Sequence, residues 1–587
     1  MKKQKKVSDS RSLKDVSRRT LIKGAAASAL AASGLVPPAE ARTSPGPFVA
    51  RPTTLVASPR KNIVETDSGK IYGFAKDGVV TFRGIPYGAS TEGKNRFMPP
   101  VKPGPWAGVR SALYWGPVSP QPFTSTLDAP RAGWKHDREA FMFEWEDGHD
   151  SEDCLRINIW TPSINDNAKR PVMVWLHGGG YVFGSDQELR MYPGDGLVRR
   201  GDVVVASVNH RLGALGFGNL TGFGEQYGSS PNVGMLDIVA ALEWVKRNIG
   251  NFGGDPNKVL IFGQSGGGGK VSTLMGMPAA QGLFHRAVVE SGSILQYGSE
   301  EASARVMAGV VAELGLSKDS IGRIQEIPYQ HIIEAAVRSQ RVWASEGNDE
   351  GVLSWGPVED GKILPFHTWT PDAPSFSKDV PLIVGNTMNE FFNSVQMEDA
   401  SADSWDMREV RKRLSSKGGG SLLSVSFGDA ADHVIDVCRK VHPDATPFTI
   451  YSLLSAMRAM RISALAQAER KAAQGGAPAY NYWFSWQTPV LDGQARAFHC
   501  SELPFVFYQT EVCAAMTGGG PEALALGARM ADAWISFART GNPNHAGLPH
   551  WPAYDPDSLP TMIFDNECVV ENDPDGEIRK AIVEAMA

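Results

Sequence analysis

The strongest constraint on the fold is a serine enclosed by glycines, placed between an apolar run and a run that is compatible with a helix. Residues 261–270 read Ile-Phe-Gly-Gln-Ser-Gly-Gly-Gly-Gly-Lys. The five residues from Gly263 to Gly267 fit the pattern G-x-S-x-G, in which glycines flank the serine because so sharp a strand-to-helix turn leaves no room for neighbouring side chains. The pattern predicts that the Ser265 hydroxyl stands at the top of a sheet.

Two other interpretations of this stretch have to be weighed. A glycine-rich turn can hold a structural serine, and five residues alone do not separate that role from catalysis. A phosphate-binding loop is suggested by Lys270, which follows glycines. That loop, G-x-x-x-x-G-K-[ST], would need Gly where Gln264 stands and Ser or Thr where Val271 stands, so it fails at two positions. The rest of the chain decides between a catalytic and a structural serine: catalysis also needs a base, an acid and oxyanion donors.

The strands of the sheet are predicted from apolar runs. Runs that are hydrophobic on both faces are typical of parallel strands covered by helices on each side. They lie at residues 171–176, 203–208, 259–262, 287–289 and 382–384, after shorter β-type runs at 70–74 and 79–85. Ile238, Leu242, Val245 and Ile249 have the spacing of one helix face, and residues 531–537 also favour a helix. This alternation indicates an α/β fold with a mostly parallel sheet.

A second glycine turn follows the first buried run directly, at His177-Gly178-Gly179-Gly180. Backbone amides converge on a developing oxyanion only where side chains do not intrude, and such a turn supplies these donors in α/β-hydrolases. A plain glycine turn is the alternative. The order of the two turns, each after a predicted strand, favours the functional interpretation.

Four further stretches carry a resemblance to a known family. They are Phe82-Arg83-Gly84-Ile85-Pro86-Tyr87, Ser151-Glu152-Asp153-Cys154-Leu155-Arg156-Ile157-Asn158, Asn209-His210-Arg211-Leu212-Gly213 and Asn251-Phe252-Gly253-Gly254-Asp255-Pro256. From about residue 65 to its end, the chain resembles the type-B carboxylesterases, the cholinesterase-like branch of the α/β-hydrolases. The resemblance implies an α/β-hydrolase fold with a large, mostly parallel central sheet flanked by helices. Residues 297–355 and 397–475 have helical composition and are expected as insertions over the site, although helices that merely pack on the sheet would have the same composition.

The resemblance also implies roles for single residues. Ser265 matches the family's nucleophile, Glu390 within residues 385–392 its acid, and His499 within residues 497–503 its base. The order of serine, acid and histidine is that of the α/β-hydrolases independently of the resemblance.

The oxyanion hole would consist of the amides of Gly179, Gly180 and Gly266. Ser291 stands where the family keeps a serine near the acid, so it is a candidate to support that acid. Four other histidines, His433, His442, His545 and His550, also lie beyond Glu390, but their surroundings match no motif. Asp360 is a rival acid, although an Asp-Gly pair more often forms a turn.

The chain departs from the family pattern at three points. Gln264 stands where the family commonly has Glu, which removes a carboxylate beside the serine and makes cationic choline esters less suitable substrates. Gly266 stands where Ala is common, but only the amide of that residue is used. No cysteine precedes Cys154, so the disulfide that often closes the loop before it cannot form within the chain, and we expect that loop to be more mobile. No pairing is predicted among the five cysteines Cys154, Cys438, Cys500, Cys513 and Cys568.

The first 41 residues are expected to be a targeting segment. A basic stretch is followed by an apolar run of small residues and by Ala39-Glu40-Ala41, an A-x-A cleavage signal. Residues 17–23, Ser-Arg-Arg-Thr-Leu-Ile-Lys, resemble a bacterial twin-arginine export signal, whereas a basic arm for nucleic acid would not explain the apolar run. We therefore expect an exported, periplasmic or secreted protein. Residues 42–60 would be a flexible lead-in to a single domain over residues 61–587.

The charge balance argues against some classes of partner. Lys and Arg number 58 against 64 Asp and Glu, and the net charge changes from −6 to about −12 once residues 1–41 are excluded. A negative surface disfavours binding to nucleic acid or anionic lipid. No run approaches the roughly 18 apolar residues that crossing a membrane requires, so no stable membrane anchor is expected. The oligomeric state is not predicted.

Together these features predict an exported serine carboxylesterase that cleaves a small-molecule ester through an acyl-enzyme. No metal or organic cofactor is implied. An inactive cholinesterase-like binding module is the alternative from another class, and an amidase or thioesterase would use the same residues. The natural substrate is open. Five aromatic residues next to motif positions are candidates to line a gorge: Tyr181, Phe183, Phe391, Phe392 and Phe505.

Overall fold

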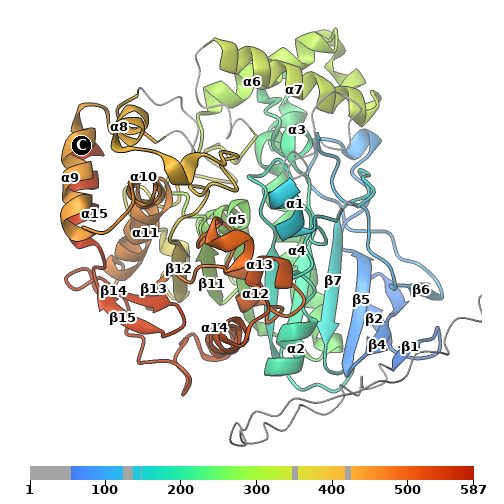
Figure 1. The fold of residues 1–587 in the computed structure, drawn as a ribbon. Helices are drawn as coiled ribbons and strands as arrows, with labels where there is room; N and C mark the ends of the chain where they lie inside the picture. Colours follow the sequence, from blue (N-terminus) through green and yellow to red (C-terminus); the bar gives the residue numbers. More distant parts are fainter. Residues whose placement is uncertain (1–53, 123–136, 147, 347–354, 417–424, 587) are drawn as a thin grey trace, which may run out of the picture. The chain divides into compact units, whose positions relative to one another are not determined.

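The computed structural model describes residues 54–122, 137–146, 148–346, 355–416 and 425–586. The expected targeting segment, residues 1–41, and most of the expected lead-in lie outside these ranges. Residues 53–587 form one compact unit. Figure 1 shows a twisted sheet that runs across this unit, with helices on both of its faces.

Twelve strands form the main sheet, and its centre is parallel. Their order is β1 (Leu55–Ala57), β4 (Phe74–Lys76), β5 (Val79–Pro86), β7 (Arg156–Thr161), β9 (Val204–Val208), β8 (Arg170–Leu176), β10 (Gly254–Gln264), β11 (Arg286–Glu290), β12 (Leu382–Thr387), β13 (Ala479–Phe484), β14 (Pro560–Phe564) and β15 (Val569–Asn572). The strands from β9 to β14 pair in parallel, and those at both edges pair antiparallel. The predicted fold class, an α/β fold with a large, mostly parallel sheet, is thereby confirmed.

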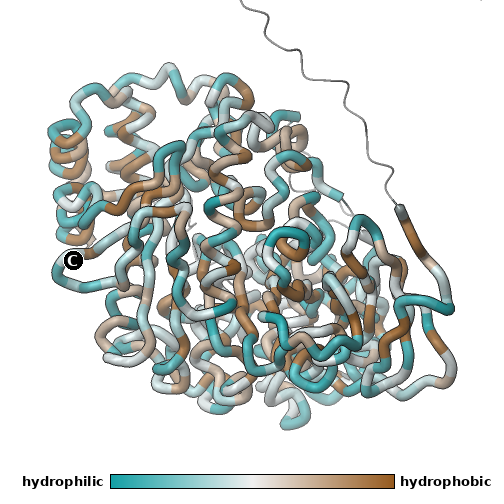
Figure 2. The backbone as a smooth tube through the Cα atoms, turned by 90° about the horizontal axis from the view of Figure 1, so that it is seen from below, coloured by the Kyte–Doolittle hydropathy of each residue, from teal (hydrophilic) through white to brown (hydrophobic). Residues whose placement is uncertain are grey.

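The central strands are buried on both faces, as their apolar runs predict. In β8, Val172, Val174 and Leu176 belong to one hydrophobic core, and Met173 and Trp175 belong to a second core on the other face. This alternation follows from the two-residue repeat of a strand, which points successive side chains to opposite faces. Figure 2 shows hydrophobic segments interleaved with hydrophilic ones along the chain. This pattern is expected of helices that turn one apolar face to the sheet and a polar face to water.

One predicted strand, at residues 70–74, is divided between two sheets. Its first part is β3 (Gly69–Tyr72), which joins β2 (Ile63–Thr66) and β6 (Val109–Ser111) in a small three-stranded sheet, whereas Phe74 begins β4 in the main sheet. The chain crosses over at Gly73, where a Cβ atom would overlap the carbonyl oxygen of Thr81. Only glycine fits at this position, where the chain passes from one sheet to the other. The sequence pattern does not show the break, and it therefore predicts one strand where the structure has two.

The helices that support the central strands lie in two layers. α4 (Val233–Asn248), α5 (Gly266–Leu274) and α11 (Ile462–Ala473) contribute to the first core, and α2 (Asp195–Gly201) and α14 (Pro521–Thr540) contribute to the second. In Figure 1, α2 and α14 lie at the bottom of the sheet. Shorter helices are α1 (Asp137–Phe143), α3 (Gly213–Phe217), α12 (Leu503–Val506) and α13 (Ala514–Thr517).

The two stretches of helical composition differ in their packing. The first holds α6 (Glu300–Glu313) and α7 (Tyr329–Ser345), which pack on each other at the top of Figure 1. In the second, α8 (Met407–Ser415), α9 (Ala431–Val441) and α10 (Pro447–Ala456) surround a third hydrophobic core together with α15 (Gly576–Met586), whereas α11 packs on β12 and β13. Among the helices that the structure describes, none combines the length and apolarity needed to cross a bilayer.

Candidate active site

The predicted site residues follow four neighbouring parallel strands. The turn at His177 comes after β8, Ser265 after β10, Ser291 after β11 and Glu390 after β12. Because the carboxyl ends of parallel strands meet at one edge of a sheet, these residues share that edge, where open α/β sheets bind their ligands. His499 follows β13 and reaches the same edge through a loop.

Ser265 lies at a strained turn between β10 and α5. Its backbone angles are φ 57° and ψ −124°, a region that residues other than glycine rarely adopt. The Ser265 amide donates to the Glu290 carbonyl at 2.8 Å. A Cβ atom on Gly267 would overlap the Leu176 carbonyl oxygen, and one on Gly263 would lie 2.6 Å from the Gly267 carbonyl carbon. The glycines of the pattern are therefore required by close packing of backbone on backbone, and the serine is left half-buried.

The turn after β8 brings the predicted oxyanion donors beside this serine turn. Gly179 and Gly180 have φ values of 86° and 59°, and a Cβ atom on Gly179 would overlap the Phe183 carbonyl oxygen. A Cβ atom on Gly266 would lie 2.5 Å from the Gly180 amide nitrogen. Backbone atoms of all three predicted donors are thus in the same small region, and the common alanine at position 266 would not fit this turn.

The Glu390 carboxylate is fully buried and bonded through both of its oxygens. Oε1 accepts hydrogen bonds from the Ser291 hydroxyl at 2.7 Å and the Thr387 amide at 2.9 Å, and Oε2 pairs with His499 Nδ1. The backbone of Glu390 is also left-handed, with φ 48°. Ser291 therefore contacts the acid, as the resemblance implies for that position.

His499 is held by its backbone and by an aromatic ring as well as by Glu390. Its amide donates to the Glu390 carbonyl at 3.0 Å, and its imidazole stacks on Phe391 with 3.8 Å between ring centroids. When Nδ1–H donates its hydrogen bond to the carboxylate, Nε2 of the neutral ring is left as an acceptor. The side chain is 4% exposed.

The closest polar neighbour of His499 Nε2 is Gln264. The Gln264 amide nitrogen lies 3.0 Å from Nε2 and 3.4 Å from Nδ1, while its oxygen accepts from the Cys500 thiol at 3.1 Å. Burial raises the pKa of the Cys500 thiol well above its ordinary value, so the thiol stays protonated and can donate. Within the described ranges, the side chains that bond to the His499 ring are thus Glu390 and Gln264. The sequence drew attention to Gln264 only for its missing charge, and it did not indicate Cys500, although that residue directly follows His499.

Two further buried carboxyl groups lie behind the site. Burial raises the pKa of Glu290 to about 8, and its Oε1 accepts from the Trp534 indole at 2.8 Å. Burial, together with the charges of Glu290 and Glu390, raises the pKa of Glu502 well above its ordinary value. Burial thus favours the neutral form of both groups, and neither Glu502 oxygen has a hydrogen-bond partner in the part of the chain that the structure describes.

The rival residues have other surroundings. His442 pairs with Asp575 at 2.9 Å, His545 contacts the Arg529 carbonyl at 3.0 Å, and His433 and His550 are exposed. Asp360 accepts from the amides of residues 362–364, as expected of a turn.

Of the aromatic candidates for a gorge, Phe391 stacks on the His499 imidazole, and the Phe183 amide donates to the Gly179 carbonyl at 2.9 Å. Tyr181, Phe392 and Phe505 pack in the hydrophobic cores, against Phe217, Tyr451 and Phe484 respectively.

All five cysteines are free thiols, so the described chain contains no disulfide. Across the described ranges, His, Cys, Asp and Glu form no group of three or more that could hold a metal ion.

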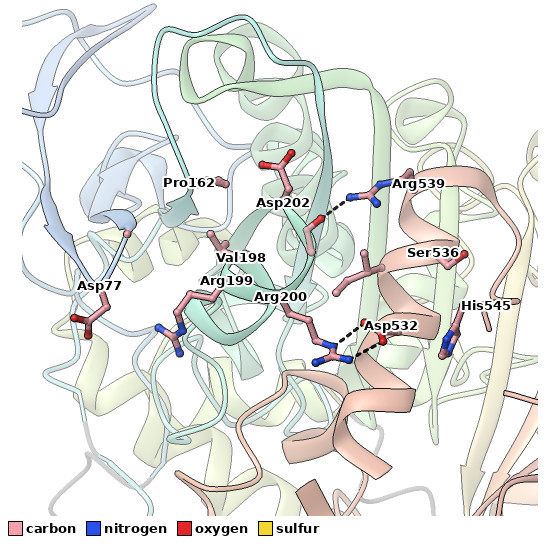
Figure 3. A pocket seen from close by; sticks show the side chains of 13 residues that line it. Asp77, Pro162, Val198, Arg199, Arg200, Asp202, Asp532, Ser536, Arg539 and His545 are labelled. Carbon is pink, nitrogen blue, oxygen red and sulfur yellow. Dashed lines mark hydrogen bonds and ion pairs between the residues drawn. The ribbon is translucent and has the colours of Figure 1, made fainter. Parts of the chain in front are cut away.

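A groove of about 760 Å³ lies away from these residues, at the amino ends of the strands (Figure 3). It is bordered by α2 and α14, and Arg200 forms two hydrogen bonds of 2.6 Å with Asp532 across it. Arg539 donates to the Gly201 carbonyl there. No predicted site residue lines this groove.

The fold and the serine-bearing turn define the class of the molecule as an α/β-hydrolase. The sequence model of the "Carboxylesterase family" matches residues 60–577, and the chain therefore belongs to the carboxylesterase family. Para-nitrobenzyl esterase of Bacillus subtilis (strain 168) is 32% identical over 528 residues, which cover 89% of this chain and 98% of the relative. Phenmedipham hydrolase of Pseudarthrobacter oxydans is 32% identical over 515 residues, covering 86% and 95%.

Solved structures agree with this assignment. An esterase from anaerobic Clostridium hathewayi, described as able to hydrolyze aliphatic aromatic polyesters, matches with a TM-score of 0.75 and 34% identity over 91% of this chain and all of its own. A carboxylesterase of Geobacillus stearothermophilus matches with a TM-score of 0.72 and 34% identity, over 89% of this chain and all of its own. The predicted family and enzyme class are confirmed.

Proposed function

We propose that the protein hydrolyses carboxylic esters through an acyl-enzyme on Ser265, with His499 as the base and Glu390 as its partner. The observation that carries the proposal is the meeting, at one sheet edge, of a strained serine turn and a buried His–Glu pair. A serine hydroxyl is a weak nucleophile at neutral pH and needs an adjacent base to take its proton.

The first half of the reaction follows from these contacts. His499 Nδ1 keeps its proton on the bond to Glu390, so Nε2 is free to accept the Ser265 proton while Oγ attacks the ester carbonyl. For this step Nε2 has to exchange its contact with Gln264 for one with Ser265. Catalytic hydrogen bonds in ligand-free enzymes are often long and form fully only with substrate. Glu390 then stabilises the charged imidazolium.

The tetrahedral intermediate carries a negative oxygen, for which the amides of Gly179, Gly180 and Gly266 are the proposed donors. The intermediate collapses when His499 protonates the leaving alcohol, and the acyl group remains on Ser265. Water, deprotonated by His499, attacks the acyl-enzyme, and the same donors stabilise the second intermediate before the acid leaves. No step requires a metal or an organic cofactor.

We propose small, uncharged esters as the substrate class. Gln264 puts a neutral amide where a carboxylate would attract a cation, which disfavours choline esters. Among the relatives, the para-nitrobenzyl esterase of Bacillus subtilis supports esters that carry an aromatic group. A panel of aryl and alkyl esters of increasing acyl length tests this class, and a choline ester cleaved faster than its uncharged analogue would contradict it.

Replacing the nucleophile tests the mechanism. Ser265→Ala is expected to lower kcat by about 10⁴ or more, because no other group forms the acyl-enzyme. Ser536→Ala is the matched control, since Ser536 borders the groove of Figure 3 and donates only to backbone carbonyls there. Near-normal turnover of Ser265→Ala would mean that another serine is the nucleophile. Equal rates on an ester and its matched amide would make the enzyme an amidase.

We also propose that residues 1–41 direct export by a twin-arginine route, on the strength of Arg18, Arg19 and the Ala39-Glu40-Ala41 signal. Replacing both arginines by lysine in the full chain should leave the enzyme in the cytoplasm of a bacterial host that has this route. Unchanged periplasmic activity would contradict the proposal.

A further inference from the structure

Lys270 is the residue of the glycine-rich stretch that the proposed reaction does not use. It lies on α5, five residues after Ser265, and its side chain is completely buried. Its Nζ donates to the His177 carbonyl oxygen at 2.8 Å. The sequence excluded a phosphate-binding role for this lysine, so its burial needs another explanation.

The lysine is built into the contact between α5 and the oxyanion turn. Its Nζ lies 5.9 Å from the centre of the Tyr181 ring, and a Cβ atom on Gly269 would lie 2.7 Å from the Tyr181 hydroxyl oxygen. Tyr181 follows Gly180 directly and has φ 65°. The helix that begins at the proposed nucleophile is thus packed closely against the segment that carries two of the proposed oxyanion donors.

A lysine in this place can donate in either charge state. Burial lowers the pKa of Lys270 to about 7, and Glu188 opposes that shift. Burial and the charge of Lys270 lower the pKa of His177 well below its ordinary value, so His177 is neutral. Both an ammonium and a neutral amine carry N–H groups, so the hydrogen bond to the His177 carbonyl does not depend on the charge.

The His177 carbonyl is a sensitive place for a fixed contact. It directly follows the last residue of β8 and shares a peptide plane with the Gly178 amide, so its direction sets how the following glycines enter the turn. Glycine adopts positive and negative φ values about equally readily, so the left-handed conformations of these glycines depend on contacts with their neighbours. A displacement of about 1 Å in a group that positions the reaction can cost about 10²-fold in rate.

We propose that Lys270 is a positioning residue for the oxyanion turn, which ties the His177 peptide to the helix that carries Ser265 and so keeps nucleophile and donors in register. The inference rests on the proposed function of Gly179 and Gly180. It assigns Lys270 no contact with substrate, and its effect should therefore be on the transition state more than on binding.

Replacement of Lys270 by methionine tests the inference, because methionine has a similar shape and no donor. Active sites are first titrated with a fluorophosphonate, and kcat is expressed per labelled Ser265. Lys270→Met is expected to lower kcat about 10- to 100-fold with KM changed less than threefold. The affinity for a trifluoromethyl ketone, which forms a tetrahedral adduct, should fall in parallel with kcat/KM.

Lys471→Met is the matched control. Lys471 is also completely buried, and its Nζ donates at 3.0 and 2.6 Å to the carbonyls of Ser377 and Lys378, which precede the amino end of β12. Both variants are expected to lower the melting temperature, but only Lys270→Met should lower kcat per labelled site. Normal kcat and normal ketone affinity in Lys270→Met would overturn the inference, as would equal losses of kcat in the two variants.

A second variant covers the case in which Lys270→Met does not fold. Lys270→Gln keeps an N–H donor on a chain about one atom shorter, so kcat is expected to fall about three- to tenfold; an unchanged kcat would contradict the inference. Failure of the proposed function is distinguishable, because the wild-type protein would then fail to label at Ser265 or to turn over esters.

Discussion

The two ends of the parallel sheet differ in how far their charged side chains are exposed to water. At the carboxyl end, Ser265, Ser291 and Glu390 all have positive φ values, and the acid and its histidine are buried. At the amino end, the groove of Figure 3 is bordered by ion pairs between side chains that are partly in water, such as Arg200 and Asp532. Both ends have polar contacts and residues at positive φ, because Asp77 and Asp202 at the groove have φ values of 51° and 45°, but these two residues are exposed whereas Ser291 and Glu390 are buried.

The difference indicates which end of the sheet carries the active site. Strained backbone persists only when the surroundings force it, and such residues cluster at functional sites. At the carboxyl end the force comes from backbone packed on backbone, as at Gly267 and Gly179. Partly exposed ion pairs need no such support and contribute little to stability.

Breaking the His–Glu pair should have the largest effect among changes around the nucleophile. Glu390→Gln keeps the shape but removes the charge that stabilises the imidazolium, so kcat should fall about 10³-fold. Glu502→Gln is the control, because burial favours the neutral form of Glu502 and glutamine imitates that form; kcat should change less than threefold. Both are measured as kcat and KM on one ester. Similar losses of kcat in the two variants would contradict a special role for Glu390 as the partner of His499.

Filling the oxyanion turn should have the next largest effect. In Gly179→Ala the new methyl group would overlap the Phe183 carbonyl oxygen, and the left-handed backbone would be strained. Displacing one oxyanion donor costs about 10²- to 10³-fold in kcat, and we expect a loss of about 10² with little change in KM. Gly78→Ala, at a left-handed glycine that borders the groove with nothing near its Cβ position, should cost only stability. An unaffected kcat in Gly179→Ala would exclude this turn as the oxyanion hole.

Two ion pairs near the opposite ends of β9 sharpen the comparison for stability. Beyond its carboxyl end, Arg211 and Asp237 have side chains that are 2% and 0% exposed, whereas before its amino end those of Arg200 and Asp532 are 23% and 37% exposed. Asp237→Asn leaves a buried guanidinium without its charge partner, and should cost about 3–5 kcal/mol of unfolding free energy. Asp532→Asn should cost less than about 1 kcal/mol. Denaturant unfolding measures both, and equal costs would contradict the contrast between the two ends.

The smallest effect expected is a pH-dependent one at Glu290. Its pKa is raised to about 8 in the folded state, so the folded protein binds a proton that the unfolded chain releases above about pH 4.5. Stability should therefore decrease as pH rises from about 4.5 toward 8. Glu290→Gln removes this cost, and its melting temperature should exceed that of the wild type at pH 7.5 and equal it at pH 4. A difference independent of pH would show that Glu290 does not titrate in this way.

The sequence predicted the centre of the sheet and the order of the site residues well. Strands such as β8 and β9 are buried on both faces, so their apolar runs are unmistakable. β13 reads Ala-Tyr-Asn-Tyr-Trp-Phe, and its buried Asn481 bonds to the neighbouring Val384 carbonyl, so burial does not show as an unbroken apolar run. The search for apolar runs therefore does not predict this strand.

Contacts between residues that are distant in the chain could not be predicted from the sequence. That Gln264 lies between His499 and Cys500, and that Lys270 reaches the His177 carbonyl, depends on how loops pack after the sheet has formed. The same holds for Gly266, whose departure from the family pattern is explained only by the 2.5 Å that would separate its Cβ from the Gly180 nitrogen. The proposed roles of Ser265, Glu390 and His499 stay predictions until they are measured.

The most direct test of the central claim is to locate a fluorophosphonate adduct by peptide mass spectrometry. The intact wild-type protein should carry one adduct, on Ser265, and its ester hydrolysis should be lost in proportion to labelling. Ser265→Ala should remain unlabelled although folded. An intact protein without a label would indicate a binding module that lacks the chemistry, and an adduct on any other residue would contradict the proposed site.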